Sequence, residues 1–111
     1  MDVEERKEGK VLVVKLRNKR LDAQMAMEFK QKMSDYIAKE NFHVVLNISE
    51  VEFIDSSGLG AIVSALKLLG GRGDLVISGT QDSVMRMFKL TRMNKVFNMF
   101  DTEREAVESL A

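Results

Sequence analysis

The sequence predicts an α/β fold, in which a small mixed, mostly parallel sheet of four to five strands packs against about four helices. Three observations lead to this prediction. Short β-branched runs alternate along the chain with segments whose apolar residues recur every three or four positions. The run at 43–48 is apolar at nearly every position, as expected of a strand covered on both faces. Connections are short and no linker or repeat interrupts the pattern, so we expect one domain over residues 1–111.

The first half of the chain contains three predicted strands and one predicted helix. A loose edge strand begins at Val3, a clearer strand covers 11–16, and the apolar run covers 43–48. The first two strands either join the parallel sheet or form an antiparallel hairpin. A helix begins at Asp22, a good N-cap residue, because apolar side chains follow at helical spacing: Met25, Phe29, Met33, Tyr36 and Ile37.

The second half alternates helices and strands in the same way. A very apolar helix at 59–69 ends at the glycine-rich segment 70–73, since glycine readily adopts the positive φ of a helix C-cap. A strand follows at 74–78, then a shorter helix with Val84, Met87 and Phe88 on one face, and a weaker strand at 94–100. The last helix covers 103–110, and Thr102 with Glu105 forms a capping box at its start.

Two groups of apolar residues leave a choice open. The helix at 59–69 carries more apolar side chains than one buried stripe requires, so some either pack against a neighbouring helix or stay exposed for a partner. Methionines in the C-terminal third either fill the core or form a pliant surface, and core filling is the favoured interpretation: Met85, Met87, Met93 and Met99.

Composition argues against several classes of protein. Seventeen basic and seventeen acidic side chains balance, which argues against nucleic acid as a general partner. There is no cysteine and only one histidine, so no disulfide, thiol nucleophile or zinc site is expected, and no metal or cofactor is predicted. No run of about eighteen apolar residues exists and the N-terminus is highly charged. We therefore expect a cytoplasmic protein without membrane insertion.

The stretch from Phe53 to Gly60 organises the candidate site, where a buried strand ends and the apolar helix begins. Asp55, Ser56 and Ser57 are three helix-capping residues in a row, and the sequence does not decide which of them is the cap. Gly58 and Gly60 are expected to keep the turn bare, so that another molecule can approach it. A helix start also favours a phosphate group electrostatically. On residue types alone, simple capping is the commoner role of such a turn.

Catalytic machinery is not predicted. The serines lack a Gly-x-Ser-x-Gly elbow, and the only histidine, His43, opens the strand whose other end leads to Ser56. At about 3.3 Å per residue, several residues' length of strand separates the two. The glycine-rich segment 70–73 closes a helix and has no Gly-Lys-Ser/Thr after it, so it does not form a phosphate cradle. We expect a protein that is not an enzyme.

The run Asp55-Ser56-Ser57-Gly58-Leu59-Gly60 after an Ile-rich strand resembles the pattern of the STAS domain, and specifically the bacterial anti-sigma factor antagonists. The resemblance covers nearly the whole chain and implies a small STAS-like fold. It implies phosphorylation of Ser56, the serine directly after the aspartate. It also implies a partner-binding surface made from the loop before the first helix and from the motif itself: Asp22, Asp55, Ser56, Ser57, Gly58, Leu59 and Gly60.

The same resemblance implies the partners and the mechanism. The unphosphorylated protein would bind an ATP-binding anti-sigma factor serine kinase and release a sigma factor, regulating transcription by partner switching. A PP2C-type phosphatase would then remove the phosphate from Ser56. Many members carry Gly-Glu before Leu-Asp, whereas this chain has Lys19-Arg20 before Leu21-Asp22, which reverses a charge in the contact loop. Which kinase, phosphatase and sigma factor take part stays open; a monomer is expected, with a dimer not excluded.

Two alternatives remain at this stage. The first keeps the fold without phosphorylation, as a STAS scaffold or regulatory subunit of a larger signalling or lipid-transport assembly. The second is a small hydrolase or nucleotide-binding enzyme, which the missing base and phosphate cradle disfavour. Retention of both serines in the motif favours the phosphorylation switch over the scaffold.

Overall fold

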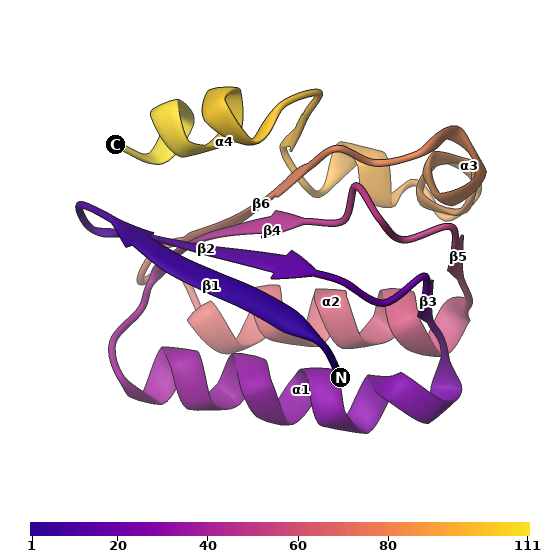
Figure 1. The fold of residues 1–111 in the computed structure, drawn as a ribbon, viewed down its shortest axis with the longest axis horizontal. Helices are drawn as coiled ribbons and strands as arrows, with labels where there is room; N and C mark the ends of the chain where they lie inside the picture. Colours follow the sequence, from indigo (N-terminus) through magenta and orange to yellow (C-terminus); the bar gives the residue numbers. More distant parts are fainter.

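A five-stranded mixed sheet lies at the centre of the molecule, in a computed structural model that describes all of residues 1–111 (Figure 1). The strand order is β1-β2-β4-β6-β7. β1 runs antiparallel to β2, and every other neighbouring pair is parallel. The predicted mixed, mostly parallel sheet is therefore confirmed, with the first two strands forming a hairpin. The strands are β1 (Val3–Glu8), β2 (Val11–Leu16), β4 (His43–Asn47), β6 (Asp74–Ser78) and β7 (Met99–Phe100).

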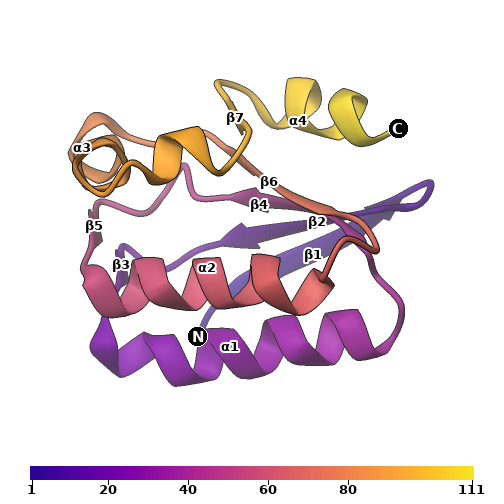
Figure 2. The same ribbon diagram turned by 180° about the vertical axis from the view of Figure 1, so that it is seen from behind.

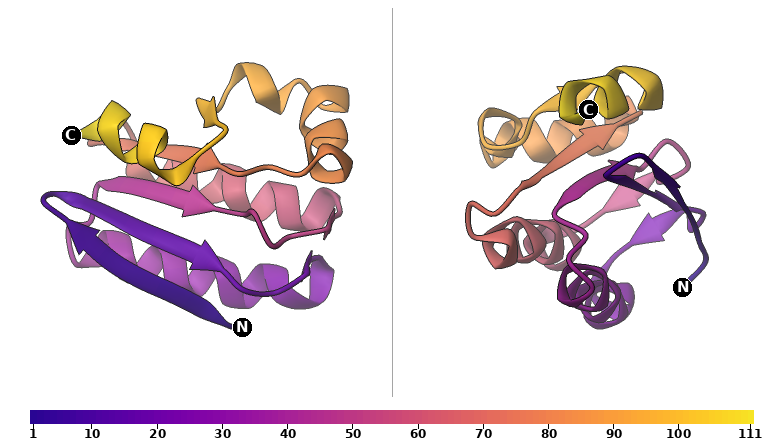
Figure 3. Two further views of the ribbon diagram at one scale, coloured as in Figure 1. Left: turned by 45° about the horizontal axis from the view of Figure 1, so that its top comes forward. Right: turned by 90° about the vertical axis from the view of Figure 1, so that its left-hand side faces the viewer.

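Four helices cover the sheet unequally, as Figures 2 and 3 show. α1 (Ala23–Ala38) and α2 (Ser56–Leu69) lie side by side on one face, and the short α4 (Glu103–Leu110) lies on the other. α3 (Asp82–Leu90) and the 3₁₀ turn η1 (Met93–Lys95) sit at the end of the molecule toward which β2 and β4 point. Most buried side chains form one cluster between the sheet and α1, α2 and α3, while a second cluster of five lies between the sheet and α4.

A second, two-stranded sheet lies at that same end and was not expected from the sequence. β3 (Arg20–Leu21) pairs in parallel with β5 (Phe53–Ile54). Strands of two residues carry no periodicity of their own, so only the pairing of distant segments defines them. This small sheet holds the segment before α1 against the segment before α2, which places the two helix starts next to each other.

Several local expectations hold and one is wrong. Gly70 adopts the left-handed conformation at the C-cap of α2, with φ of 56°, and the capping box of Thr102 and Glu105 is formed. The strand predicted at 94–100 shrinks to β7, and η1 occupies its first part. The reason is Phe97, which is buried with its ring 6.0 Å from that of Phe88 in an edge-to-face arrangement. That packing draws the segment onto α3 and away from the sheet edge.

The surplus of apolar residues on α2 is mostly used inside the molecule. One face of the helix is buried against the sheet, and Val63 and Leu66 are half-buried against the same cluster. Leu68 remains exposed. The four C-terminal methionines are partly buried against the larger cluster, which agrees with core filling: Met85, Met87, Met93 and Met99.

Candidate functional site

One carboxylate, that of Asp55, caps two helices at once. Its Oδ1 accepts from the N–H of Gly58 in the first turn of α2 at 2.8 Å. Its Oδ2 accepts from the N–H of Ala23, the first residue of α1, at 3.1 Å. Each helix start has unpaired N–H donors and a partial positive charge, so a single carboxylate between them is favoured by both dipoles. The open choice among three capping residues is thereby resolved: Asp55 is the cap.

Gly58 allows the two helix starts to approach this closely. A Cβ at Gly58 would lie 2.0 Å from the carbonyl oxygen of Leu21, a distance at which atoms overlap. Gly58 is buried, as is Leu59 beside it. The expectation that Gly58 leaves room for another molecule is therefore wrong, because Leu21 of the same chain fills that space. Gly60 is exposed, and a Cβ added to it would meet nothing within 4 Å, so it does keep its side of the turn bare.

Ser56 and Ser57 are both exposed at the first two positions of α2. Because Asp55 performs the capping, neither hydroxyl is used for that purpose. Ser56 lies at one end of a hollow of about 400 Å³ that continues along α2 toward α3 and η1. Gly60 and Lys67 line its α2 side, and Thr91 and Met93 line the opposite side. The structure thus presents a hydroxyl at a helix start that opens onto a groove.

Asp22 lies beside this turn, because Asp22 follows β3 as Asp55 follows β5, and these two strands pair in parallel. Its Oδ1 caps α1 by accepting from the N–H of Gln24 at 3.2 Å, and its Oδ2 pairs with Arg20 at 3.2 Å. The guanidinium of Arg20 also stacks on the exposed ring of Phe53, 4.2 Å from its centroid. The basic pair at 19–20 therefore lies beside segment 52–54, which leads to the turn, with Arg20 held in place and Lys19 free of ion pairs.

His43 begins β4, and Ser56 follows the loop at the other end of that strand, as expected from the sequence. No group of three histidine, aspartate or glutamate side chains lies close enough to hold a metal ion. None of the helices is both long enough and apolar enough to cross a lipid bilayer.

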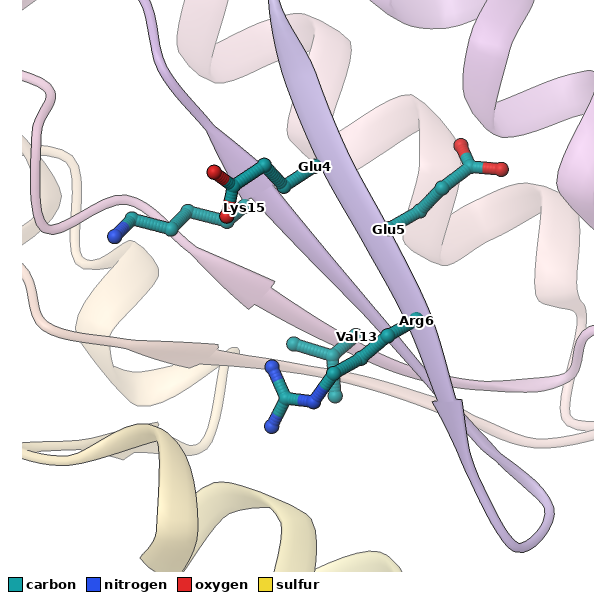
Figure 4. A pocket seen from close by; sticks show the side chains of 5 residues that line it. All are labelled: Glu4, Glu5, Arg6, Val13 and Lys15. Atoms are coloured by element: carbon teal, nitrogen blue, oxygen red, sulfur yellow. The ribbon is translucent and has the colours of Figure 1, made fainter.

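A second hollow, of about 260 Å³, lies on the β1–β2 hairpin, on the face of the sheet that α4 covers (Figure 4). Five residues line it, and the side chain of Glu5 points away from the other four: Glu4, Glu5, Arg6, Val13 and Lys15. Its charged groups are engaged in ion pairs: Arg6 with Glu8 and Glu103, Arg17 with Glu4 and Glu50, and Lys15 with Glu50. The positive and negative charges around this hollow are therefore matched within the chain.

The two carboxylates with a shifted pKa, Glu103 and Glu50, belong to this ion-pair network. Burial raises the pKa of Glu103, but hydrogen bonds from Asn47 and Arg6 outweigh it and hold that pKa below its usual value. The hydrogen bond from Lys15 and the charge of Arg17 lower the pKa of Glu50. Such shifts accompany structural ion pairs as well as active sites. Here the lowered pKa values result from the ion pairs and hydrogen bonds that join α4 and the hairpin to the rest of the sheet.

Five residues that line the groove were not among the predicted site residues: Val63, Ser64, Lys67, Thr91 and Met93. Met93 was considered only as core filling or pliant surface. Lys67 lies far along α2, and Thr91 and Met93 come from the segment that ends α3 and forms η1. The lone charge of Lys67 in an otherwise apolar helix was the only local signal that could have drawn attention to it.

Comparison with known proteins places the chain in a family. A model of the STAS domain matches residues 2–106. The anti-sigma-B factor antagonist of Listeria monocytogenes is 33% identical over 86 residues, which are 77% of this chain and 75% of that protein. An anti-sigma factor antagonist from Mycobacterium paratuberculosis has a TM-score of 0.89 at 22% identity, covering 98% of this chain and 92% of its own.

The Bacillus cell fate determinant SpoIIAA, solved in its phosphorylated form, has a TM-score of 0.75 at 19% identity over 99% of this chain and 100% of its own. At such identities the two structures support the fold, while the Listeria protein and the family model carry the relationship in sequence. The capped turn, the mixed sheet and these matches lead to one conclusion: the chain belongs to the STAS domain family, among relatives that include anti-sigma factor antagonists.

Proposed function

We propose that this protein is a cytoplasmic anti-sigma factor antagonist, a single STAS domain whose binding to its partner is switched by phosphorylation of Ser56. The observation that carries the proposal is the exposed Ser56 hydroxyl at the first position of α2, with the capping role taken by Asp55. A kinase can reach such a hydroxyl without unfolding the helix. The protein contributes only the acceptor; ATP, Mg²⁺ and the base come from the kinase.

A phosphate at this position is compatible with the fold. It adds a charge of roughly −1.5 to −2 at a helix start, where the dipole favours negative charge. Phosphorylation should therefore act on binding and leave folding intact. Within a protein interface the same group must lose its water, which costs several kcal/mol unless a cation is positioned to receive it. A penalty of about 3 kcal/mol weakens binding more than a hundredfold.

The proposed partner is an ATP-binding anti-sigma factor serine kinase, which the unphosphorylated protein binds so that a sigma factor is released. A PP2C-type phosphatase restores Ser56. Names of relatives support this: the Listeria protein is an anti-sigma-B factor antagonist, and SpoIIAA is known in unphosphorylated and phosphorylated forms. The proposed contact surface consists of Asp22, Ser56, Ser57 and Gly60, with Asp55, Gly58 and Leu59 shaping it from beneath.

The test uses the anti-sigma factor kinases encoded in the same cell, each purified and incubated with the protein and ATP. Mass spectrometry should find one added phosphate, which Ser56→Ala abolishes and Ser57→Ala retains. Ser57 is the matched control because it is the next residue, equally exposed and on the same helix turn. Binding to the kinase should fall more than a hundredfold for the phosphorylated protein and for Ser56→Asp, with an unchanged circular dichroism spectrum.

Two outcomes would contradict the proposal. One is a phosphate that maps to another residue, and the other is a Ser56→Asp variant that binds the kinase as tightly as the wild type. Stable incorporation into a larger assembly without any phosphorylation would favour the alternative function, a STAS scaffold or regulatory subunit.

A further inference from the structure

The neutral net charge of the chain conceals an uneven distribution. Residues 60–98 carry six lysines and arginines but only two aspartates. All ion pairs of the chain lie outside this segment, at the N-terminus, the β1–β2 hairpin, the start of α1 and α4. Arg72 donates to the carbonyl groups of Leu68 and Leu69, at the end of α2. The other five cations have no acidic partner: Lys67, Arg86, Lys89, Arg92 and Lys95.

One of these cations, Lys67, lies in the hollow that begins at Ser56, and a second, Arg92, lies at its edge in sequence, between the two lining residues Thr91 and Met93. Leu59 and Val63 contribute apolar lining from α2. The α3–η1 segment, which Figure 2 shows at the same end of the molecule as the start of α2, also exposes Leu90 and Val96, at 78% and 51% of their surface. The hollow therefore combines apolar lining with unpaired positive charge.

We propose that this hollow is a docking groove for an acidic segment of the same partner protein that covers Ser56. The inference rests on the proposed function, because the groove is continuous with the phosphorylation site. Unpaired cations beside apolar surface are complementary to a segment with acidic and apolar side chains, and such complementarity steers association and fixes the register of docking.

The proposal also explains why a phosphate on Ser56 would oppose binding. Lys67 lies eleven residues along α2, about 16 Å away at 1.5 Å per residue, which exceeds the screening length of about 8 Å at physiological salt. The backbone of Lys67 therefore does not lie beside the phosphate in the way that a direct ion-pair partner on the next helix turn would. An acidic segment entering the groove would meet the phosphate as a like charge at the Ser56 end. The unphosphorylated protein therefore attracts the acidic segment of the partner, and the phosphorylated protein repels it.

The first experiment measures binding of the unphosphorylated full chain to the kinase that phosphorylates Ser56, at low and high salt. Lys67→Glu should weaken binding by about tenfold, mainly through the association rate, and should reduce the salt dependence. Lys67→Gln should show a smaller loss, and it guards against helix destabilisation by a negative charge in the last turn of α2. Lys10→Glu is the matched control, since Lys10 is exposed in the β1–β2 turn at the opposite end of the sheet.

The outcomes separate the two proposals. If the kinase phosphorylates Ser56 and binds both Lys67 variants as it binds the wild type, the acidic-groove inference is overturned and the switch stands. If no kinase binds or phosphorylates the protein, the proposed function fails. In that case the groove is tested by titrating the protein with poly-L-glutamate and following its amide chemical shifts by NMR. The amide shifts of Lys67, Thr91 and Met93 should change, and that of Lys10 should not. Shifts confined to other surfaces, or caused only by phosphatidylglycerol-containing vesicles, would overturn the inference.

Discussion

The close approach at Gly58 makes a sharp prediction about stability: Gly58→Ala should be strongly destabilising, whereas Gly60→Ala should not. In Gly58→Ala the new methyl group would lie 2.0 Å from the carbonyl oxygen and 2.8 Å from the carbonyl carbon of Leu21. Leu21 cannot retreat cheaply, because it is buried, pairs with Ile54 in the small sheet and accepts the N–H of Asp55. The start of α2 must therefore move away by about an ångström or more.

The magnitude follows from what that movement disturbs. Overpacking of this kind costs about 1–3 kcal/mol, and loss of the bond from Ala23 to Asp55 adds about 1 kcal/mol. The better helix propensity of alanine returns at most about 1 kcal/mol. We expect a net loss of about 1–3 kcal/mol, a large share of the roughly 5–15 kcal/mol that stabilises a typical domain. The melting temperature should fall by about 10 °C.

The assay is urea denaturation followed by circular dichroism, since the chain has no tryptophan to report by fluorescence. Gly60→Ala is the control within the same turn: nothing lies within 4 Å of its added methyl group, so helix propensity alone should stabilise it by up to about 1 kcal/mol. Equal stability of Gly58→Ala and the wild type, or equal destabilisation by both substitutions, would refute the assigned role of Gly58.

Three further predictions concern other parts of the fold. Asp55→Ala should lower the free energy of unfolding, measured by urea denaturation, by about 1–2 kcal/mol, because it removes a capping hydrogen bond from each of two helices. Hydrogen exchange should become faster at the N–H of Ala23 as well as within α2. Faster exchange in α2 alone would contradict the shared cap. Because the pKa of Glu103 is lower in the folded protein than its ordinary value of 4.5, its contribution to stability is present above that pH and disappears as the pH falls through the folded value. Acid unfolding of Glu103→Gln should accordingly show a weaker dependence on pH, and an unchanged dependence would refute the role of this carboxylate. Tyr36, the only tyrosine, has its pKa raised well above 10 by burial and by its hydrogen bond to Glu5, so its ultraviolet titration in the folded protein should begin at higher pH than in urea, and Glu5→Gln should reduce the difference.

Much of the fold follows from local patterns in the chain. Helical spacing in α1, the apolar run of β4 and the glycines after α2 each depend on residues close together in sequence, and the structure confirms all three. The prediction of a strand over 94–100 was wrong for most of its length, because the apolar residues of this segment can pack either at the edge of the sheet or against α3. The burial of Phe97 against Phe88, which no local pattern encodes, made the choice.

The candidate site divides in the same way. The sequence by itself determined that a capped, serine-bearing turn joins a buried strand to an apolar helix, because capping residues and helix starts are local features. Only the tertiary structure decided that Asp55 caps two helices and that Leu21 fills the space beside Gly58. It also decided that Lys67 and Met93 line the same groove as Ser56. Each of these depends on segments far apart in the chain meeting at one end of the sheet, and the strand pairing that brings them together carries no signal in any single segment.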